Sequence, residues 1–162
     1  MIRILGIVVF SVSVSLCGFL MSHSLSSKAR KRREFIELIY AIKNGIQYGK
    51  LSLREIFSSF SGNELKKCGF LKALCENENA SIEEVLTDFP TGLTDKENEL
   101  IFAFAKECGK STFSEEEIKN CERYVLLLEA LDKQLSSEEN TKKLVYGKLG
   151  ILAGILSCIL LM

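Results

Sequence analysis

Few residues of this 162-residue chain could do chemistry, and their spacing matches no known metal or catalytic pattern. The chain has one histidine, His23, and six cysteines without a Cys-x-x-Cys pair: Cys17, Cys68, Cys75, Cys108, Cys121 and Cys158. Zinc sites need closely spaced Cys and His ligands, and a cysteine nucleophile needs a nearby base. We therefore predict no metal ligands, no cofactor-binding residues and no catalytic residues. We interpret the thiols as small buried hydrophobes in a reducing compartment.

Carboxylates are the remaining candidates for acid–base chemistry. The densest group, Glu115–Glu117, lies in the first turn of a predicted helix, where negative charge complements the helix dipole. A solvated helix start explains this group better than a cation site does. Motifs for phosphate binding, dinucleotide binding, serine hydrolysis and zinc proteolysis are absent from the sequence. The sequence therefore predicts a protein that is not an enzyme and has no small-molecule substrate.

The N-terminal residues are strongly apolar from Ile4 to Met21. As a helix this run would be roughly 27 Å long, close to the hydrocarbon thickness of a bilayer. Five basic residues follow it closely: Lys28, Arg30, Lys31, Arg32 and Arg33. Because positive charge stays on the cytoplasmic side, we predict that residues 1–25 are a transmembrane anchor and that these basic side chains face the membrane. A cleaved leader ending near Ser22 or Ser24 is the alternative, and the positive charge opposes it.

The C-terminus is apolar again from Leu149 to Met162. Starting the segment at Leu144 gives nineteen residues, with Lys148 able to reach back to the headgroups. Lys142 and Lys143 precede it and put its near side on the same basic membrane face. We predict that residues 144–162 form a second transmembrane helix; the alternative is a buried core helix.

Residues 26–143 have the 3- and 4-residue apolar spacing of helices, which predicts an all-α, antiparallel bundle of about six helices. The clearest stripes are Phe35, Leu38, Ile39, Ile42 and Ile46 in the first helix, and Ile118, Cys121, Tyr124, Val125, Leu128, Leu131 and Leu135 in the last. Expected helices cover residues 28–48, a short segment after Ser52, residues 64–77, and segments that start at Ser81, Thr94 and Ser114. Capping boxes predict the last three starts, and Ser26 or Ser27 is expected to cap the first helix.

The net charge is zero, but its distribution is uneven. Residues 1–50 carry eight basic and two acidic side chains, whereas residues 51–162 carry thirteen basic and nineteen acidic ones. The basic residues crowd one position without interleaved aromatics, so no nucleic acid partner is expected. Membrane lipids are the expected partner: the cluster either binds anionic headgroups or only sets the topology.

Two further features could contact proteins. Gly109, Lys110 and Ser111 connect two predicted helices and form either a partner-docking loop or a plain helix end. Tyr48 and Gly49 with Phe57 and Phe60 form either a surface groove or part of the core.

Several segments, in this order, resemble the stage III sporulation protein AB family of endospore-forming Firmicutes. They are the anchor with its basic residues, residues 37–49 with Leu53, Phe89–Pro90, residues 104–111 and residues 146–154. The similarity covers essentially the whole chain, and residues 104–111 and the Lys-Leu-Gly tail are its most specific parts.

The resemblance implies a cytosolic helical domain similar to those of the inner-membrane platform proteins of type II secretion systems and type IV pili. It implies a non-enzymatic, membrane-anchored assembly component of a secretion-like channel between mother cell and forespore, needed for endospore formation. The expected location is the mother-cell membrane around the forespore. The expected partners are the other proteins of the stage III operon, including its secretion-type ATPase. The alternative is a membrane-tethered regulatory protein, or an exported helical protein, unrelated to a channel.

Overall fold

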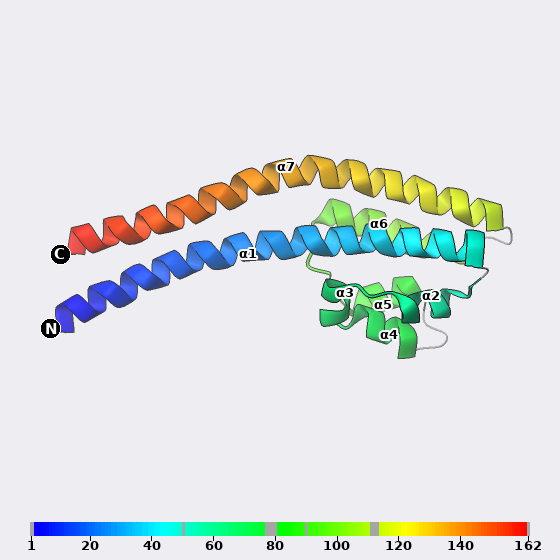
Figure 1. Cartoon of the computed structure of the whole chain (residues 1–162), viewed down its shortest axis with the longest axis horizontal. Helices are drawn as coiled ribbons and strands as arrows, with labels where there is room; N and C mark the ends of the chain where they lie inside the picture. The colour runs from blue at the N-terminus through cyan, green and yellow to red at the C-terminus, as the bar shows by residue number, and fades with distance from the viewer. Residues whose placement is uncertain (1, 50, 77–80, 90, 111–113, 162) are drawn as a thin grey trace. The chain divides into compact units, whose positions relative to one another are not determined.

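The computed structural model describes residues 2–49, 51–76, 81–89, 91–110 and 114–161, and within these ranges the regular elements are all helices (Figure 1). The predicted all-α class is therefore confirmed. The elements are α1 (Ile2–Asn44), the π-helix η1 (Gly45–Gly49), α2 (Leu53–Ser59), α3 (Asn63–Lys67), α4 (Phe70–Glu76), α5 (Ile82–Asp88), α6 (Asp95–Glu107) and α7 (Ser114–Leu161).

The chain forms two compact units. Residues 28–133 make up the first, which we call the bundle unit. Residues 1–27 together with residues 134–162 make up the second, which we call the paired-helix unit. The paired-helix unit combines the beginning of α1 with the end of α7, so both chain termini belong to it (Figure 1).

Helix α1 runs through the serine-rich stretch at which the sequence predicted a new helix start. The Ser26 hydroxyl donates a hydrogen bond of 3.2 Å to the carbonyl of Ser22, four residues earlier. This bond lies within the helix, so Ser26 does not cap it, and the prediction of a cap at Ser26 or Ser27 was wrong. A serine hydroxyl can bond to the carbonyl four residues earlier without ending the helix, as it does here.

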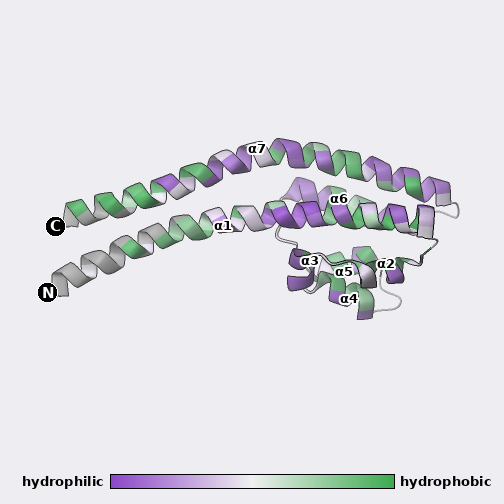
Figure 2. Ribbon diagram, viewed as in Figure 1, coloured by the Kyte–Doolittle hydropathy of each residue, from purple (hydrophilic) through white to green (hydrophobic). Residues whose placement is uncertain are grey.

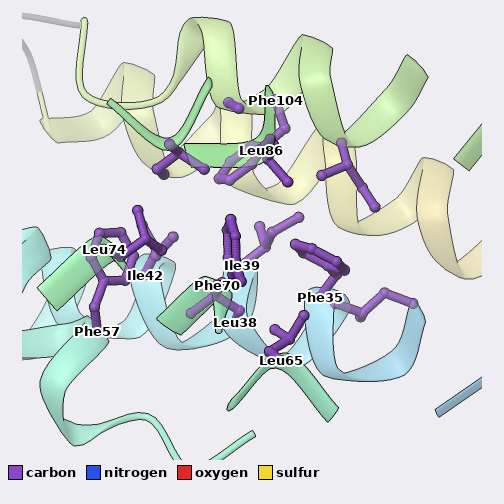
Figure 3. Packing of buried hydrophobic residues seen from close by; sticks show 14 of the residues in the cluster. Phe35, Leu38, Ile39, Ile42, Phe57, Leu65, Phe70, Leu74, Leu86 and Phe104 are labelled. Carbon is purple, nitrogen blue, oxygen red and sulfur yellow. The ribbon is translucent and has the colours of Figure 1, made fainter. Parts of the chain in front are cut away.

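The core of the bundle unit forms around the predicted face of α1. Phe35, Leu38, Ile39 and Ile42 are buried there, which confirms the predicted stripe, and Ile46 is partly buried. Figure 3 shows these four side chains packed with residues from the shorter helices: Phe57, Leu65, Phe70, Leu74, Leu86 and Phe104. From α7 the core receives Cys121, Tyr124, Val125 and Leu128, also as predicted. The rings of Phe35 and Phe70 lie 5.4 Å apart, and those of Phe104 and Tyr124 lie 5.6 Å apart.

The short helices begin where side chains satisfy their first backbone amides. Ser81 with Glu84 and Thr94 with Glu97 form the predicted capping boxes, and Ser52 with Glu55 forms another that the sequence analysis did not identify. The predicted box at Ser114 differs, because Ser114 is the first residue of α7. A backbone amide outside that helix binds Glu117.

The predicted helix over residues 64–77 is two helices, α3 and α4, separated at Gly69. Gly69 has φ +82°, a conformation that residues with a Cβ rarely adopt. A Cβ added there would also lie 3.0 Å from the ring of Phe89. The chain therefore turns at Gly69, although the apolar spacing continues across it.

Helix α1 gives way to η1 at Gly45, within the predicted first helix. A Cβ at Gly45 would lie 2.4 Å from Ile56 Cδ1, so a larger residue there would displace the Ile56 side chain of α2. Tyr48, within η1, is exposed, whereas Phe57 is buried and Phe60 packs against the core.

The paired-helix unit exposes many large apolar side chains, and hydrophobic positions recur along the described parts of both its helices (Figure 2). They include Val12, Leu16, Phe19, Leu20 and Met21 on α1 and Leu144, Val145, Leu149, Ile151, Leu152, Ile155, Leu156 and Ile159 on α7. Across the residues that the structure describes, no helix combines the length and hydropathy that a membrane span requires. The two predicted transmembrane helices are thus not supported by the described residues.

Candidate functional site

The predicted membrane-face residues on α1 occupy different environments. Arg30 is exposed and donates to Glu64 Oε1 at 3.3 Å. Lys31 is partly buried and donates to the carbonyl oxygen of Thr91. Arg33 is exposed, and Lys28 is partly buried.

Arg32 is different, because its side chain is 0% exposed. Its Nη1 donates to Glu97 Oε1 at 2.6 Å, and its Nε donates to Asp132 Oδ1 at 2.6 Å. The arginine thus joins α1 to the start of α6 and to α7. Its charge is neutralised inside the bundle unit and is not presented at the surface.

The Arg32 network extends to the start of α6. Glu97 Oε2 accepts hydrogen bonds from the backbone amide and the hydroxyl of Thr94, while its Oε1 binds Arg32. One carboxylate therefore both caps α6 and compensates the buried cation. Arg33 Nε approaches the second oxygen of Asp132 at 3.4 Å, from the solvent side. A buried charge is tolerated only when it is paired and hydrogen-bonded in this way.

The lysines near the C-terminal segment lie in the paired-helix unit. Lys142, Lys143 and Lys148 are exposed, and Lys142 forms an ion pair of 3.7 Å with Glu138. Lys143 and Lys148 line a hollow of about 480 Å³ together with Ser22, Asn140, Leu144, Gly147 and Ile151. Both lysines are therefore accessible for the predicted contact with a membrane face, which remains a prediction.

The predicted docking loop is described only in part, because Ser111 lies outside the described residues. Gly109 and Lys110 are exposed, and the Gly109 amide donates to Glu117 Oε1 at 2.8 Å. This bond ties the end of α6 to the first turns of α7.

A hollow of about 860 Å³ lies beside this loop, between the end of α6 and the start of α7. Its lining carries four cations and two carboxylates: Lys106, Glu107, Lys110, Glu116, Lys119, Asn120 and Arg123. Arg123 donates to Glu107 at 2.5 Å and to Asn120 at 3.0 Å, and its guanidinium lies 4.7 Å from the centre of the Tyr124 ring. The hollow therefore has an excess of positive charge within the acidic part of the chain.

Two thiols, Cys108 and Cys121, lie close to the buried carboxylate of Glu117. Burial raises the pKa of the Cys108 thiol above its ordinary value, and the charge of Glu117 raises it further. The same two causes raise the pKa of Cys121 to about 12. Protonated thiols are poor nucleophiles and poor metal ligands. Among the described residues, no group of three or more His, Cys, Asp or Glu side chains is placed to hold a metal ion.

Comparison with known families identifies the chain. The family model of stage III sporulation protein AB matches residues 3–162. The chain belongs to this family. No curated protein and no solved structure matches it. Membership in the stage III sporulation protein AB family confirms the resemblance and assigns the chain a role in stage III sporulation.

Within this family member, two segments that carried the resemblance have clear positions. Residues 104–110 cover the end of α6 and the residues just after it, and Lys106, Glu107 and Lys110 among them line the cationic hollow. Residues 146–154 lie in α7 within the paired-helix unit.

Sequence reasoning missed the Arg32 network, although a signal was present. Arg32 precedes Phe35 by three residues and Ile39 by seven, so it lies on the apolar face of the helix and not on the polar one. Its partners could not be found in this way, because Glu97 and Asp132 come from distant parts of the chain. Glu117 was also taken as a solvated residue, and it is buried.

Proposed function

We propose that this chain is a non-enzymatic, membrane-anchored assembly component of a secretion-like channel between mother cell and forespore. Its bundle unit lies in the mother-cell cytosol and docks partner proteins, and its paired-helix unit attaches it to the membrane around the forespore. The partners are other proteins of the stage III operon, including the secretion-type ATPase. Family membership supports the setting, which is stage III sporulation.

The positions of the polar groups in the bundle unit support an assembly role. Its buried ionic groups bond to other parts of the fold, as in the contacts of Arg32 with Glu97 and Asp132. The thiols of Cys108 and Cys121 have raised pKa values and stay protonated at neutral pH. The cationic hollow, by contrast, is exposed. This arrangement supports a domain whose interior is held by its own ion pairs and whose exposed charged residues contact other molecules.

Membrane attachment is supported by the composition of the paired-helix unit. So many exposed large apolar side chains on two helices favour a membrane or protein contact. Lys142, Lys143 and Lys148 lie at the start of the apolar part of α7, where they suit anionic headgroups. The resemblance of the bundle unit to secretion and pilus platform domains belongs to the same proposal, and its support is the all-helical architecture.

Co-purification tests the proposal. The detergent-solubilised full-length chain, recovered from membranes of sporulating cells, is expected to bring the ATPase and other operon products with it. A variant with all six cysteines replaced by alanine is expected to keep both partner recovery and spore yield. Loss of sporulation in that variant, at normal abundance and fold, would contradict a purely structural role and favour a catalytic or regulatory one.

Labelling of Cys68 and Cys75 tests the placement. Both thiols are partly exposed. A membrane-impermeant reagent is expected to label them only after cells are opened. Labelling in intact cells, together with a shortened N-terminus, would support the exported alternative.

A further inference from the structure

The outward face of α7 in the bundle unit has an unusual composition for a solvated helix face. At helical spacing, it is formed by Glu116, Lys119, Asn120, Arg123, Leu126, Leu127 and Ala130. The core-facing residues Cys121, Val125 and Leu128 lie on the opposite side of the helix. The residues up to Arg123 line the cationic hollow.

Two leucines stand where a solvated helix normally carries polar residues. Leu126 is 66% exposed and Leu127 is 45% exposed. They follow Arg123 by three and four residues, so they extend the same surface by one turn. A cationic hollow and an apolar strip are thus continuous along one helix.

Two neighbouring carboxylates of α7, Glu122 and Glu129, are engaged with α1, whereas Glu115, four residues before Lys119, is exposed. Glu122 forms an ion pair of 2.8 Å with Lys43, and Glu129 accepts a hydrogen bond from Tyr40 at 3.1 Å. Both therefore point toward α1. Within the hollow, two carboxylates stand against four cations, although acidic residues outnumber basic ones in residues 51–162.

We infer that this surface, which we call the α7 docking face, binds an acidic amphipathic helix of another protein. Glutamate or aspartate side chains of that helix occupy the hollow, and its leucine-type residues cover Leu126 and Leu127. A small anion would leave the leucines uncovered, whereas a helix of three or four turns spans both parts. The inference rests on the proposed function, because it names the chemistry of a docking partner.

A synthetic helical peptide of about 18 residues provides the probe, with glutamates in its first turns and leucines in the following turns of the same face. Its fluorescence anisotropy is measured against the detergent-solubilised full-length chain. Binding is expected, and it should weaken when salt rises from about 0.05 to about 0.3 M, because the contacts are exposed ion pairs. The matched control peptide carries glutamine in place of each glutamate and should bind at least about tenfold more weakly. Equal binding of the two peptides, or no binding of the acidic one, overturns the inference.

Three double variants locate the site on the protein. Lys110→Glu with Lys119→Glu is expected to weaken peptide binding about tenfold or more through charge repulsion. Leu126→Ser with Leu127→Ser is expected to weaken it similarly, since it removes the apolar contacts. The control is Lys66→Glu with Lys96→Glu, two exposed lysines outside the hollow, and it should bind like the wild type. Unchanged binding in both test variants overturns the inference.

A photo-crosslinking amino acid at position 127 identifies the occupant in sporulating cells, with Thr87, exposed on α5, as the control position. An adduct mapped to an acidic helix of another protein supports the inference. An adduct between two copies of this chain, or none, overturns it. If the variant Lys110→Glu with Lys119→Glu keeps normal partner co-purification and spore yield, the inferred docking face is refuted and the proposed assembly role is not. If the wild-type chain brings no partner, the assembly role fails, and the peptide titration still decides the docking face.

Discussion

Replacing Arg32 with methionine should strongly destabilise the bundle unit, although Arg32 lies in a sequence of basic residues that reads as a surface cluster. Methionine keeps much of the apolar length of the side chain and removes the charge. Glu97, 1% exposed at its side chain, and Asp132, 18% exposed, then lose their buried cation. Removing one partner of a buried ion pair costs about 3–5 kcal/mol in the free energy of unfolding, because the remaining charge stays desolvated.

Arg33→Met is the matched control, since it is the same substitution at the next residue and concerns the same aspartate. Arg33 is 59% exposed and its Nε lies 3.4 Å from Asp132 Oδ2. Exposed ion pairs of this kind contribute about 0.2–1 kcal/mol. The two variants should therefore differ by about 2 kcal/mol or more.

Hydrogen exchange on the full-length chain in detergent measures the difference in stability between the two variants at α6, which the Arg32 network joins to α1. Amides in the middle of α6 should exchange about 100-fold to several thousand-fold faster in Arg32→Met, because 1.4 kcal/mol corresponds to a factor of ten. In Arg33→Met the change should stay within about fivefold. Equal exchange rates in the two variants would refute the argument that Arg32 is a buried link between helices.

Adding Glu97→Gln to Arg32→Met separates charge from packing. Glutamine keeps an acceptor for the Thr94 amide and removes the unpaired negative charge. The double variant should recover about 1–3 kcal/mol relative to Arg32→Met, because the more deeply buried of the two carboxylates is then uncharged, while Asp132 keeps its charge. No recovery would mean that the charge of Glu97 does not cause the loss, which then comes from Asp132 or from packing.

Three further predictions concern other parts of the bundle unit. Gly69→Ala should lower the free energy of unfolding by about 1–2 kcal/mol, and with it the urea midpoint, because alanine rarely adopts a positive φ. An unchanged midpoint would contradict the need for glycine at this position. Glu34→Ala should lower the free energy of unfolding by about 1–2 kcal/mol in the same measurement, since the Glu34 carboxylate accepts hydrogen bonds of 2.9 and 2.8 Å from two backbone amides at the start of α3. A loss below about 0.3 kcal/mol would refute this capping role. Burial and Glu117 raise the pKa of Cys121 to about 12, so Cys121 should react with iodoacetamide at pH 8 far more slowly than Cys68. Between about pH 9 and 12 the thiol ionises in the unfolded chain but not in the folded one, so its contribution to the free energy of unfolding should fall as the pH rises through this range. Equal labelling rates would contradict the burial of Cys121.

Much of the fold follows from local patterns in the sequence. The apolar spacing of Phe35, Leu38, Ile39 and Ile42 predicted the buried face of α1, and the capping boxes at Ser81 and Thr94 predicted two helix starts. These features involve residues within four positions of each other, where helix geometry alone decides the neighbours.

The misses have a different physical origin. The break at Gly69 comes with its positive φ, beside the ring of Phe89, and not with any change in apolar spacing. The serines at 22–27 suggested a boundary, but a serine hydroxyl can also bond to the preceding turn, and Ser26 does so. The cationic hollow joins residues of two helices, so no single stretch of sequence contains it.

Arg32 shows most clearly how spacing and charge compete in a basic cluster. Five positive charges after an apolar run favour a membrane-facing interpretation, but Arg32 lies on the apolar side of α1 and is buried. Arg32 has the spacing of a core residue, and the chain places Glu97 and Asp132 against it. If the cluster served only to position the protein at a membrane, a buried arginine would be an unnecessary cost. The cluster therefore has two roles in the proposed arrangement: its exposed members face lipid or partners, and its buried member fixes the helices that present the α7 docking face.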